Sequence, residues 1–184
     1  MSEIQPIFYY DIGDPEAYLA AEQVLKVLPV VPEWQPVLAK NLSDEASEKL
    51  VNIDRLALEV RAEELELQSI RWPEKWPPDS EFAMLVATYA KQIGRAVAFS
   101  LAAFRQVFAG GRDLADPDTV LIAAAACEMH PNAVLRNAER ASIKTELLET
   151  TKQAKSLGIL DVPTLQIGKE LYVGQKRLQL LGLL

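Results

Sequence analysis

The chain has 184 residues, of which 49% are hydrophobic and 24% are charged. This composition is typical of a globular protein and excludes a disordered one, and the length suits one large domain or a domain with an insertion. Asp and Glu number 26 against 19 Lys and Arg, which gives a formal net charge of −7. Because nucleic acids and many membrane surfaces are anionic, we expect neither as a partner.

Two residue types that carry much of protein chemistry occur once each, as Cys127 and His130. A single cysteine permits no internal disulfide, Cys-x-x-Cys pair or thiolate-rich metal site. A single histidine makes a histidine-based zinc site or a Ser-His-Asp triad nearly untenable, and we expect no metal. The N-terminus lacks the pattern of a signal peptide, and the longest apolar run, 120–127, is far shorter than the roughly 18 residues of a membrane span. We therefore expect a soluble, cytoplasmic protein.

The first forty residues are typical of a β-α-β unit. Residues 4–10 are rich in β-branched and aromatic side chains, which predicts a short buried strand that runs into a turn. Asp14 followed by Pro15 predicts a helix start, because the carboxylate can accept from free N–H groups and proline fits the first helical position. Residues 33–39 predict a second strand, which Pro36 restricts to a sheet edge or an irregular stretch.

The middle of the chain is predicted to be helical. A helical pattern runs over 43–65, and the segment 71–78 interrupts it with three prolines, which indicates a loop. An Ala-rich region over 79–128 is divided by glycines and an Asp-Pro pair into three predicted helices. A short turn is expected over 131–139, followed by a long helix over 142–157.

The end of the chain returns to strand patterns over 163–167 and 170–173, followed by an apolar stretch that predicts a helix. This order of elements predicts an α/β fold, a thioredoxin-like sheet with an inserted all-helical domain, as in DsbA-like proteins. Residues 1–41 and 142–184 would form the thioredoxin-like domain, and residues 42–141 would form the helical insertion domain.

Several segments, in the right order, resemble one family. They are 8–11 (FYYD), 14–20 (DPEAYLA), 71–73 (RWP), 104–117 and 157–178. On these residues the chain resembles the 2-hydroxychromene-2-carboxylate isomerases and kappa-class glutathione transferases, within the wider DsbA-like group. The likeness covers nearly the whole chain but is poor over 42–68. Val162 and Pro163 stand where such folds carry a proline with a preceding cis bond, and the resemblance implies the same here.

The resemblance also implies where a thiol ligand would bind. In the family, the cysteine backbone of glutathione pairs with the residue before the cis proline, here Val162, and a serine that opens the first helix activates the thiol. Asp14 stands at that serine position, and its carboxylate competes with a thiolate for the helix N–H groups. The family's Trp/Phe-Gly-x-Asp-Arg reads Val-Gly-Gln-Lys-Arg over 173–177, so Lys176 would repel the γ-glutamyl ammonium. The expected thiol- or substrate-binding residues are Val162, Pro163, Gln175, Lys176, Trp72 and Trp76.

Each candidate residue also has a structural interpretation. Asp14 is either an ordinary N-cap or a general base at the mouth of an active site, where Glu16 would be its partner in a paired-carboxylate acid/base site. Trp72 and Trp76 either pack under the proline-rich loop or form the wall of a hydrophobic substrate pocket.

These features predict a thiol-dependent isomerase or transferase that acts on a small aromatic or conjugated acid, with glutathione or another low-molecular-weight thiol as cofactor. Two alternatives stay open: a reaction that uses Asp14 as a base without any thiol, and a non-catalytic, DsbA-like binding or partner-recognition protein. A dithiol oxidoreductase is not expected, because the sequence has no Cys-x-x-Cys pair. The apolar C-terminus, 178–184, allows a homodimer.

Overall fold

A computed structural model of the chain describes residues 5–174 and residue 179. Its sheet contains β1 (Ile7–Tyr10), β2 (Glu33–Pro36), β3 (Thr164–Ile167) and β4 (Glu170–Val173), in the order β2-β1-β3-β4. β1 pairs with β2 in parallel and with β3 in antiparallel orientation, and β3 pairs antiparallel with β4. Strands from the two ends of the chain therefore form one mixed sheet, with β2 at an edge as its proline requires.

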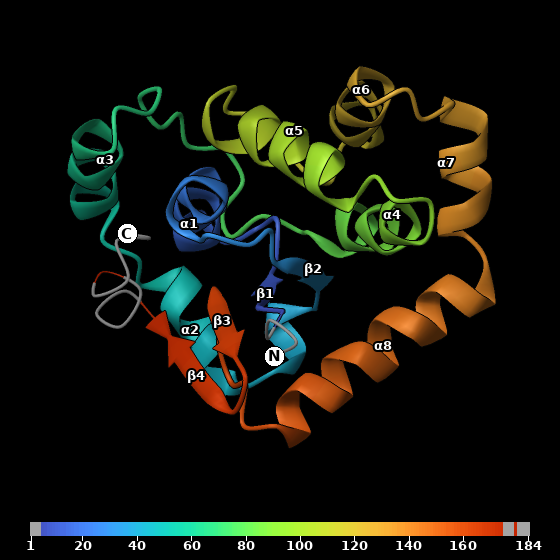
Figure 1. Ribbon diagram of the computed structural model, residues 1–184. Helices are drawn as coiled ribbons and strands as arrows, with labels where there is room; N and C mark the ends of the chain where they lie inside the picture. Colours follow the sequence, from blue (N-terminus) through green and yellow to red (C-terminus); the bar gives the residue numbers. More distant parts are fainter. Residues whose placement is uncertain (1–4, 175–178, 180–184) are drawn as a thin grey trace.

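One helix connects β1 to β2, and further helices occupy the sequence between β2 and β3 (Figure 1). They are α1 (Pro15–Val27), the short 3₁₀ helix η1 (Ala39–Asn41), α2 (Asp44–Val51), α3 (Arg55–Glu64), α4 (Glu81–Gln92), α5 (Ala96–Phe108), α6 (Pro117–Ala126), α7 (Pro131–Ala138) and α8 (Ala141–Ser156). The mixed sheet with its helices confirms the expected thioredoxin-like, DsbA-like fold. No helix within the described residues is both long and apolar enough to cross a membrane.

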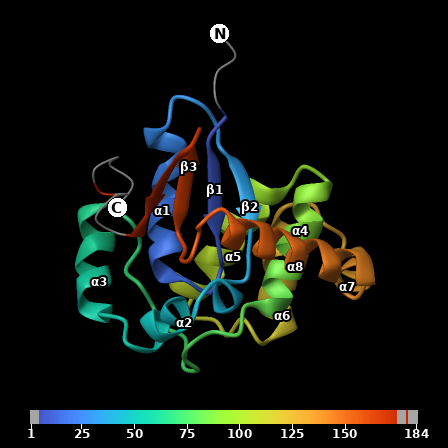
Figure 2. The same ribbon diagram turned by 90° about the horizontal axis from the view of Figure 1, so that it is seen from below.

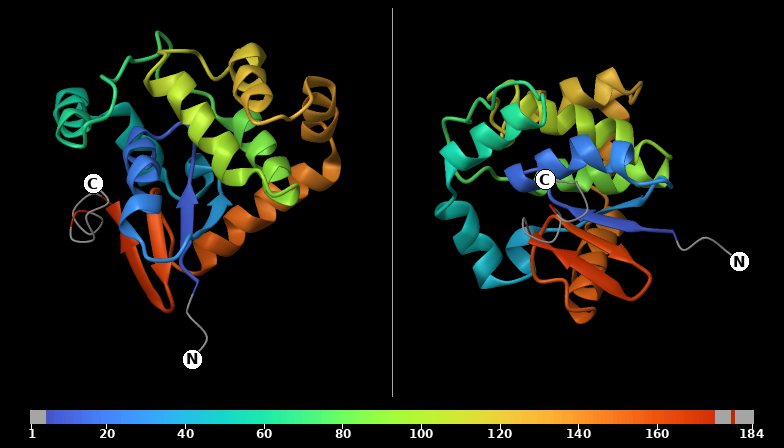
Figure 3. Two further views of the ribbon diagram at one scale, coloured as in Figure 1. Left: turned by 45° about the horizontal axis from the view of Figure 1, so that its top comes forward. Right: turned by 60° about the vertical axis from the view of Figure 1, so that its left-hand side comes forward.

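Alternation along β1 separates two cores, because successive side chains of a strand point to opposite faces. Phe8 and Tyr10 pack with Trp34 and with residues of α1, α4 and α5 in the larger core. Tyr9 faces the other way and packs in a smaller core with Ala154 of α8 and Val162. The sheet thus lies between α1 and α8, as the right panel of Figure 3 shows.

The buried hydroxyl of Tyr10 illustrates how a polar group is accommodated inside the larger core. It lies 2.6 Å from the Oγ atom of Ser100 on α5, and both side chains are fully buried. A buried hydroxyl without a partner would lose its hydrogen bonds with water, so this contact fixes where α5 crosses the sheet.

The single helix predicted over 43–65 is wrong, because the structure divides it into α2 and α3. Asn52 follows the last turn of α2, and the side chain of Asp54 accepts a hydrogen bond from the Ala57 N–H at 3.0 Å, which starts α3. Asn and Asp side chains compete for backbone hydrogen bonds and favour helix ends. The apolar residues on either side keep a helical spacing across the break. This spacing is why the sequence pattern predicts one continuous helix.

The turn predicted over 131–139 is also wrong, because these residues form α7. The Nδ1 atom of His130 accepts a hydrogen bond from the Asn132 N–H at 3.3 Å, and Pro131 takes the first helical position. Proline at this position is an ordinary helix-start signal, and the His130 side chain takes the capping role that Ser, Thr, Asp or Asn usually has. The strand predicted over 33–39 ends at Pro36, where the proline cannot donate to the ladder.

The proposed domain boundaries stay a prediction. The strands come from residues 7–36 and 164–173, as the division into 1–41 with 142–184 and 42–141 requires. The larger hydrophobic core nevertheless runs without interruption from Phe8 in the sheet to Phe99 in the helical region.

Candidate functional site

Asp14 begins α1 as its N-cap. One carboxylate oxygen, Oδ1, accepts a hydrogen bond from the Ala17 N–H at 2.8 Å, so the predicted cap is present. The side chain is fully buried, and its other oxygen, Oδ2, lies 2.8 Å from the ammonium of Lys49 on α2. Asp14 is therefore held by a helix end on one side and by a cation on the other, and solvent does not reach it.

The segment before β3 approaches the same point. The bond between Val162 and Pro163 is cis, as the resemblance implies, and Val162 is fully buried. Its N–H donates to Oδ1 of Asp161 at 2.8 Å, and its carbonyl accepts from the Lys49 ammonium at 2.6 Å. The N–H and the carbonyl of Val162, which the resemblance predicts to pair with a thiol ligand, are thus already hydrogen-bonded within the chain.

Lys49 joins these two segments. Its ammonium contacts Asp14, Asp161 at 2.8 Å, Glu16 at 3.5 Å and the carbonyl of Val162. We call Lys49, Asp14, Glu16, Asp161 and the Val162 carbonyl the Lys49 cluster. Three carboxylates face one ammonium, which leaves a net charge of −2 when all are ionised. The helix that carries Lys49, α2, lies across the end of the sheet where β1 ends and α1 begins (Figure 2).

Burial and crowding of like charges alter the ionisation of this cluster. Burial, then the nearby charge of Asp14, raises the pKa of Glu16 to about 7 despite the opposing effect of Lys49. Burial also raises the pKa of Asp161. Burial alone would lower the pKa of Lys49, but the carboxylates around it raise that pKa above its ordinary value. At neutral pH the cluster therefore holds a fixed ammonium and one carboxyl group, Glu16, that gains and loses a proton.

The two tryptophans contact α2 and α3. Trp72 and Trp76 contact each other edge to face with their ring centroids 5.2 Å apart, and the guanidinium of Arg55 lies over both rings. The indole N–H of Trp72 donates to Glu59, and that of Trp76 donates at 2.6 Å to the carbonyl of Leu50, the residue after Lys49. The structure thus brings Asp14, Val162 and Pro163 together, and places the tryptophan pair against the helix that covers them.

Gln175 and Lys176, the remaining predicted binding residues, lie outside the described residues. Lys49 and Asp161 were missed by the sequence analysis. Asp161 directly precedes the Val-Pro pair, and this position is a signal that could have drawn attention to it. Lys49 lies in the segment that matches the family poorly, so no motif marked it.

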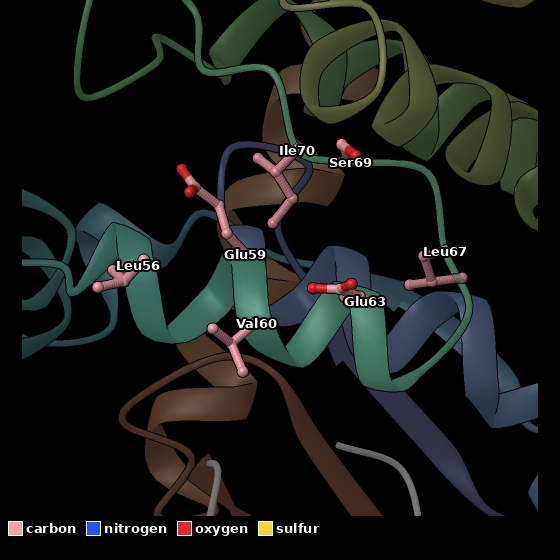
Figure 4. A pocket seen from close by; sticks show the side chains of 7 residues that line it. All are labelled: Leu56, Glu59, Val60, Glu63, Leu67, Ser69 and Ile70. Carbon is pink, nitrogen blue, oxygen red and sulfur yellow. The ribbon is translucent and has the colours of Figure 1, made fainter.

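Two cavities flank this region. One, of about 370 Å³, borders the site between α2 and the proline-rich loop, and its lining includes Asp11, Gly13, Lys40, Leu50, Pro77 and Ser80. Another, of about 410 Å³, lies between α3 and the segment 67–70 (Figure 4). No residue of the Lys49 cluster lines either cavity, but the lining of the first includes Gly13 and Leu50, which adjoin Asp14 and Lys49 in the sequence. Within the described residues, no group of three or more His, Cys, Asp or Glu side chains is arranged so that it could hold a metal ion.

Comparison with known proteins agrees with this geometry. The DSBA-like thioredoxin domain family matches residues 7–182. The chain belongs to this family. Its fold is similar to that of a 2-hydroxychromene-2-carboxylate isomerase, with a TM-score of 0.83 and 16% identity over 97% of this chain and 93% of that one. None of the curated proteins gives a significant match to the sequence.

Two further solved structures with similar folds are named as redox proteins. A probable DsbA oxidoreductase from Streptomyces coelicolor has a TM-score of 0.68 and 16% identity over 89% of this chain and 80% of that one. The cytosolic disulfide reductase DsbM from Pseudomonas aeruginosa, solved with GSH, has a TM-score of 0.62 and 14% identity over 94% of this chain and 90% of that one. Similarity at identities this low shows a shared fold. The activity has to be inferred from the residues of the site.

The site predicts that this protein does not catalyse thiol-disulfide exchange. Such exchange needs an attacking thiolate, whereas the helix start carries Asp14, with Ala17 three residues later. Cys127 follows α6, is 9% exposed, and has a pKa that burial raises. Insulin reduction by dithiothreitol should therefore be no faster with the protein than without it. Acceleration that disappears in Cys127→Ala would contradict this prediction.

Proposed function

We propose that the protein is a small-molecule enzyme of the isomerase type that works by proton transfer through Glu16 and needs no thiol. The observation that carries this proposal is the state of Glu16. Its side chain is 15% exposed, unlike the fully buried Asp14, and its pKa of about 7 leaves it partly protonated at neutral pH. A general acid or base is most effective when its pKa lies near the pH at which the enzyme works.

The reaction that suits such a group is rotation about a conjugated double bond. Glu16 lends its proton to the carbonyl oxygen of a conjugated substrate, which weakens the adjacent carbon–carbon double bond and allows it to rotate. The proton then returns to Glu16, so the substrate changes only in geometry. We place the substrate in the cavity of about 370 Å³ whose lining includes Gly13 and Leu50, the residues next to Asp14 and Lys49.

The charge of the cluster argues against the acidic substrate that the resemblance implies. Three carboxyl groups, those of Asp14, Glu16 and Asp161, face the single ammonium. An anion would meet repulsion in a partly buried, weakly screened site. A neutral or cationic conjugated carbonyl compound fits this electrostatic environment better.

A thiol-dependent isomerase or transferase is the second candidate. The cis peptide bond before Pro163, next to the start of α1, and the fold shared with an isomerase favour it. In this reading glutathione or another low-molecular-weight thiol would have to displace Lys49 from the Val162 carbonyl, which is bonded at 2.6 Å.

A glutathione titration separates the two candidates. We expect calorimetry to show no saturable binding of glutathione at concentrations up to several millimolar. Turnover of a panel of neutral, cationic and anionic conjugated carbonyl compounds, followed by ultraviolet absorbance, should not increase when glutathione is added. Tight binding, or activity that requires the thiol, would favour the second candidate. Neither binding nor turnover, with Glu16 titrating near its ordinary pKa by NMR, would favour a non-catalytic binding protein.

A further inference from the structure

We propose that the acceptors around Lys49, namely Asp14, Asp161 and the Val162 carbonyl, form a binding site for a primary ammonium group. In this structure the chain's own Lys49 fills the site. The ammonium of the substrate fills it when α2 moves away. The inference names the substrate class of the site described above, and it rests on the proposed function only for the claim that this ligand is a substrate.

The number and kind of acceptors match a primary ammonium. Such a group has three N–H donors and no acceptor. Four oxygens from three groups lie within 3.0 Å of the Lys49 nitrogen: Asp14 Oδ2 at 2.8 Å, Asp161 Oδ1 at 2.8 Å and Oδ2 at 3.0 Å, and the Val162 carbonyl at 2.6 Å. The site thus offers one acceptor group for each donor, from two segments that are far apart in the sequence.

Asp14 shows independently that this position requires a cation. Its side chain is fully buried, and within the described residues Oδ2 has no neutral hydrogen-bond donor, so that its one close partner is the Lys49 ammonium. A buried carboxylate oxygen without a donor is costly unless a positive charge faces it. The Val162 carbonyl, also buried, points to the same place and adds an acceptor without charge.

Apart from the ion pairs of Lys49, which a ligand ammonium would take over, few contacts hold the helix that carries this lysine. Of the residues in α2, Ala46 alone is fully buried. Ser43 donates to the Leu160 carbonyl at 2.8 Å, and Trp76 donates to the carbonyl of Leu50, but few apolar contacts hold the helix in place. Because a ligand ammonium would keep the three acceptor groups paired, the main remaining cost of moving α2 is its small buried apolar surface.

A thermal unfolding experiment tests the site directly. In Lys49→Ala the cation is removed, and n-butylammonium, which copies the end of a lysine side chain, should raise Tm by about 2–4 °C at saturation. Tetramethylammonium at the same concentration has no N–H donor and should leave Tm unchanged. The matched control is Lys40→Ala, which removes an exposed lysine paired with Glu81 and should show no such shift. Equal responses to the two cations in Lys49→Ala would overturn the inference.

A second measurement uses the unaltered protein, in case Lys49→Ala does not fold. A primary ammonium that displaces Lys49 frees α2, so hydrogen exchange of the amides over 44–51 should increase with n-butylammonium and not with tetramethylammonium. Exchange that is unchanged at high n-butylammonium would contradict the proposal. Neither measurement depends on activity or on the protonation of Glu16, so this inference and the proposed function fail separately.

Discussion

Replacing Lys49 with methionine is expected to lower the free energy of unfolding by about 3–5 kcal/mol at neutral pH. Methionine keeps most of the apolar stem of lysine and removes its charge, so the loss is mainly electrostatic. It leaves Asp14 fully buried without a cation, next to Asp161 and Glu16. The loss should be smaller at pH 5, where Glu16, whose pKa is about 7, is protonated. Urea denaturation at both pH values measures the difference.

Two controls separate this electrostatic effect from a general loss of packing. Lys40→Met breaks an ion pair whose side chains are 51% and 56% exposed, and it should cost less than about 1 kcal/mol. Adding Asp14→Asn to Lys49→Met should recover much of the lost stability, since the amide carries no charge and still caps a helix. If Lys49→Met were as mild as Lys40→Met, the carboxylates of the cluster would have to be hydrated, contrary to the structure.

The elements of the fold were largely predictable because local rules decide them. The aromatic strand β1, the Asp-Pro start of α1 and the buried face of α8 each follow from residue types at short spacing, and the structure has them. The errors fell where two local rules compete. Around Asn52 and Asp54, helical spacing of apolar residues continued across a helix end, and the capping side chain prevailed.

Only those site residues could be predicted whose role follows from their place at the start of a helix or strand. Asp14 was identified by its place at a helix start, and Pro163 by its place before a strand. Lys49 lies 35 positions after Asp14 and 113 before Val162, so only the tertiary fold brings them together. Its role depends on where α2 packs, and no pattern over 42–68 indicates that.

Replacing Glu16 with glutamine is expected to lower kcat/KM for the isomerisation about a hundredfold or more, the usual contribution of a general acid or base. Glutamine has nearly the same size and keeps an oxygen that can accept from Lys49, 3.5 Å away, but it cannot lend a proton. The loss should therefore appear in kcat, with the thermal stability nearly unchanged. Glu48→Gln, which removes an exposed carboxyl group from α2, is the matched control and should retain full activity.

The pH profile gives this prediction its direction. Because burial and Asp14 raise the pKa of Glu16 from 4.5 to about 7, the group stays protonated up to neutral pH and loses its proton above it. As a proton donor it should therefore support full activity near pH 6, and activity should fall as the pH rises through 7. In Glu16→Gln the small remaining activity should lack this step. Activity that increases through pH 7 would show that Glu16 acts as a base, and a profile without a step near 7 would remove it from the reaction.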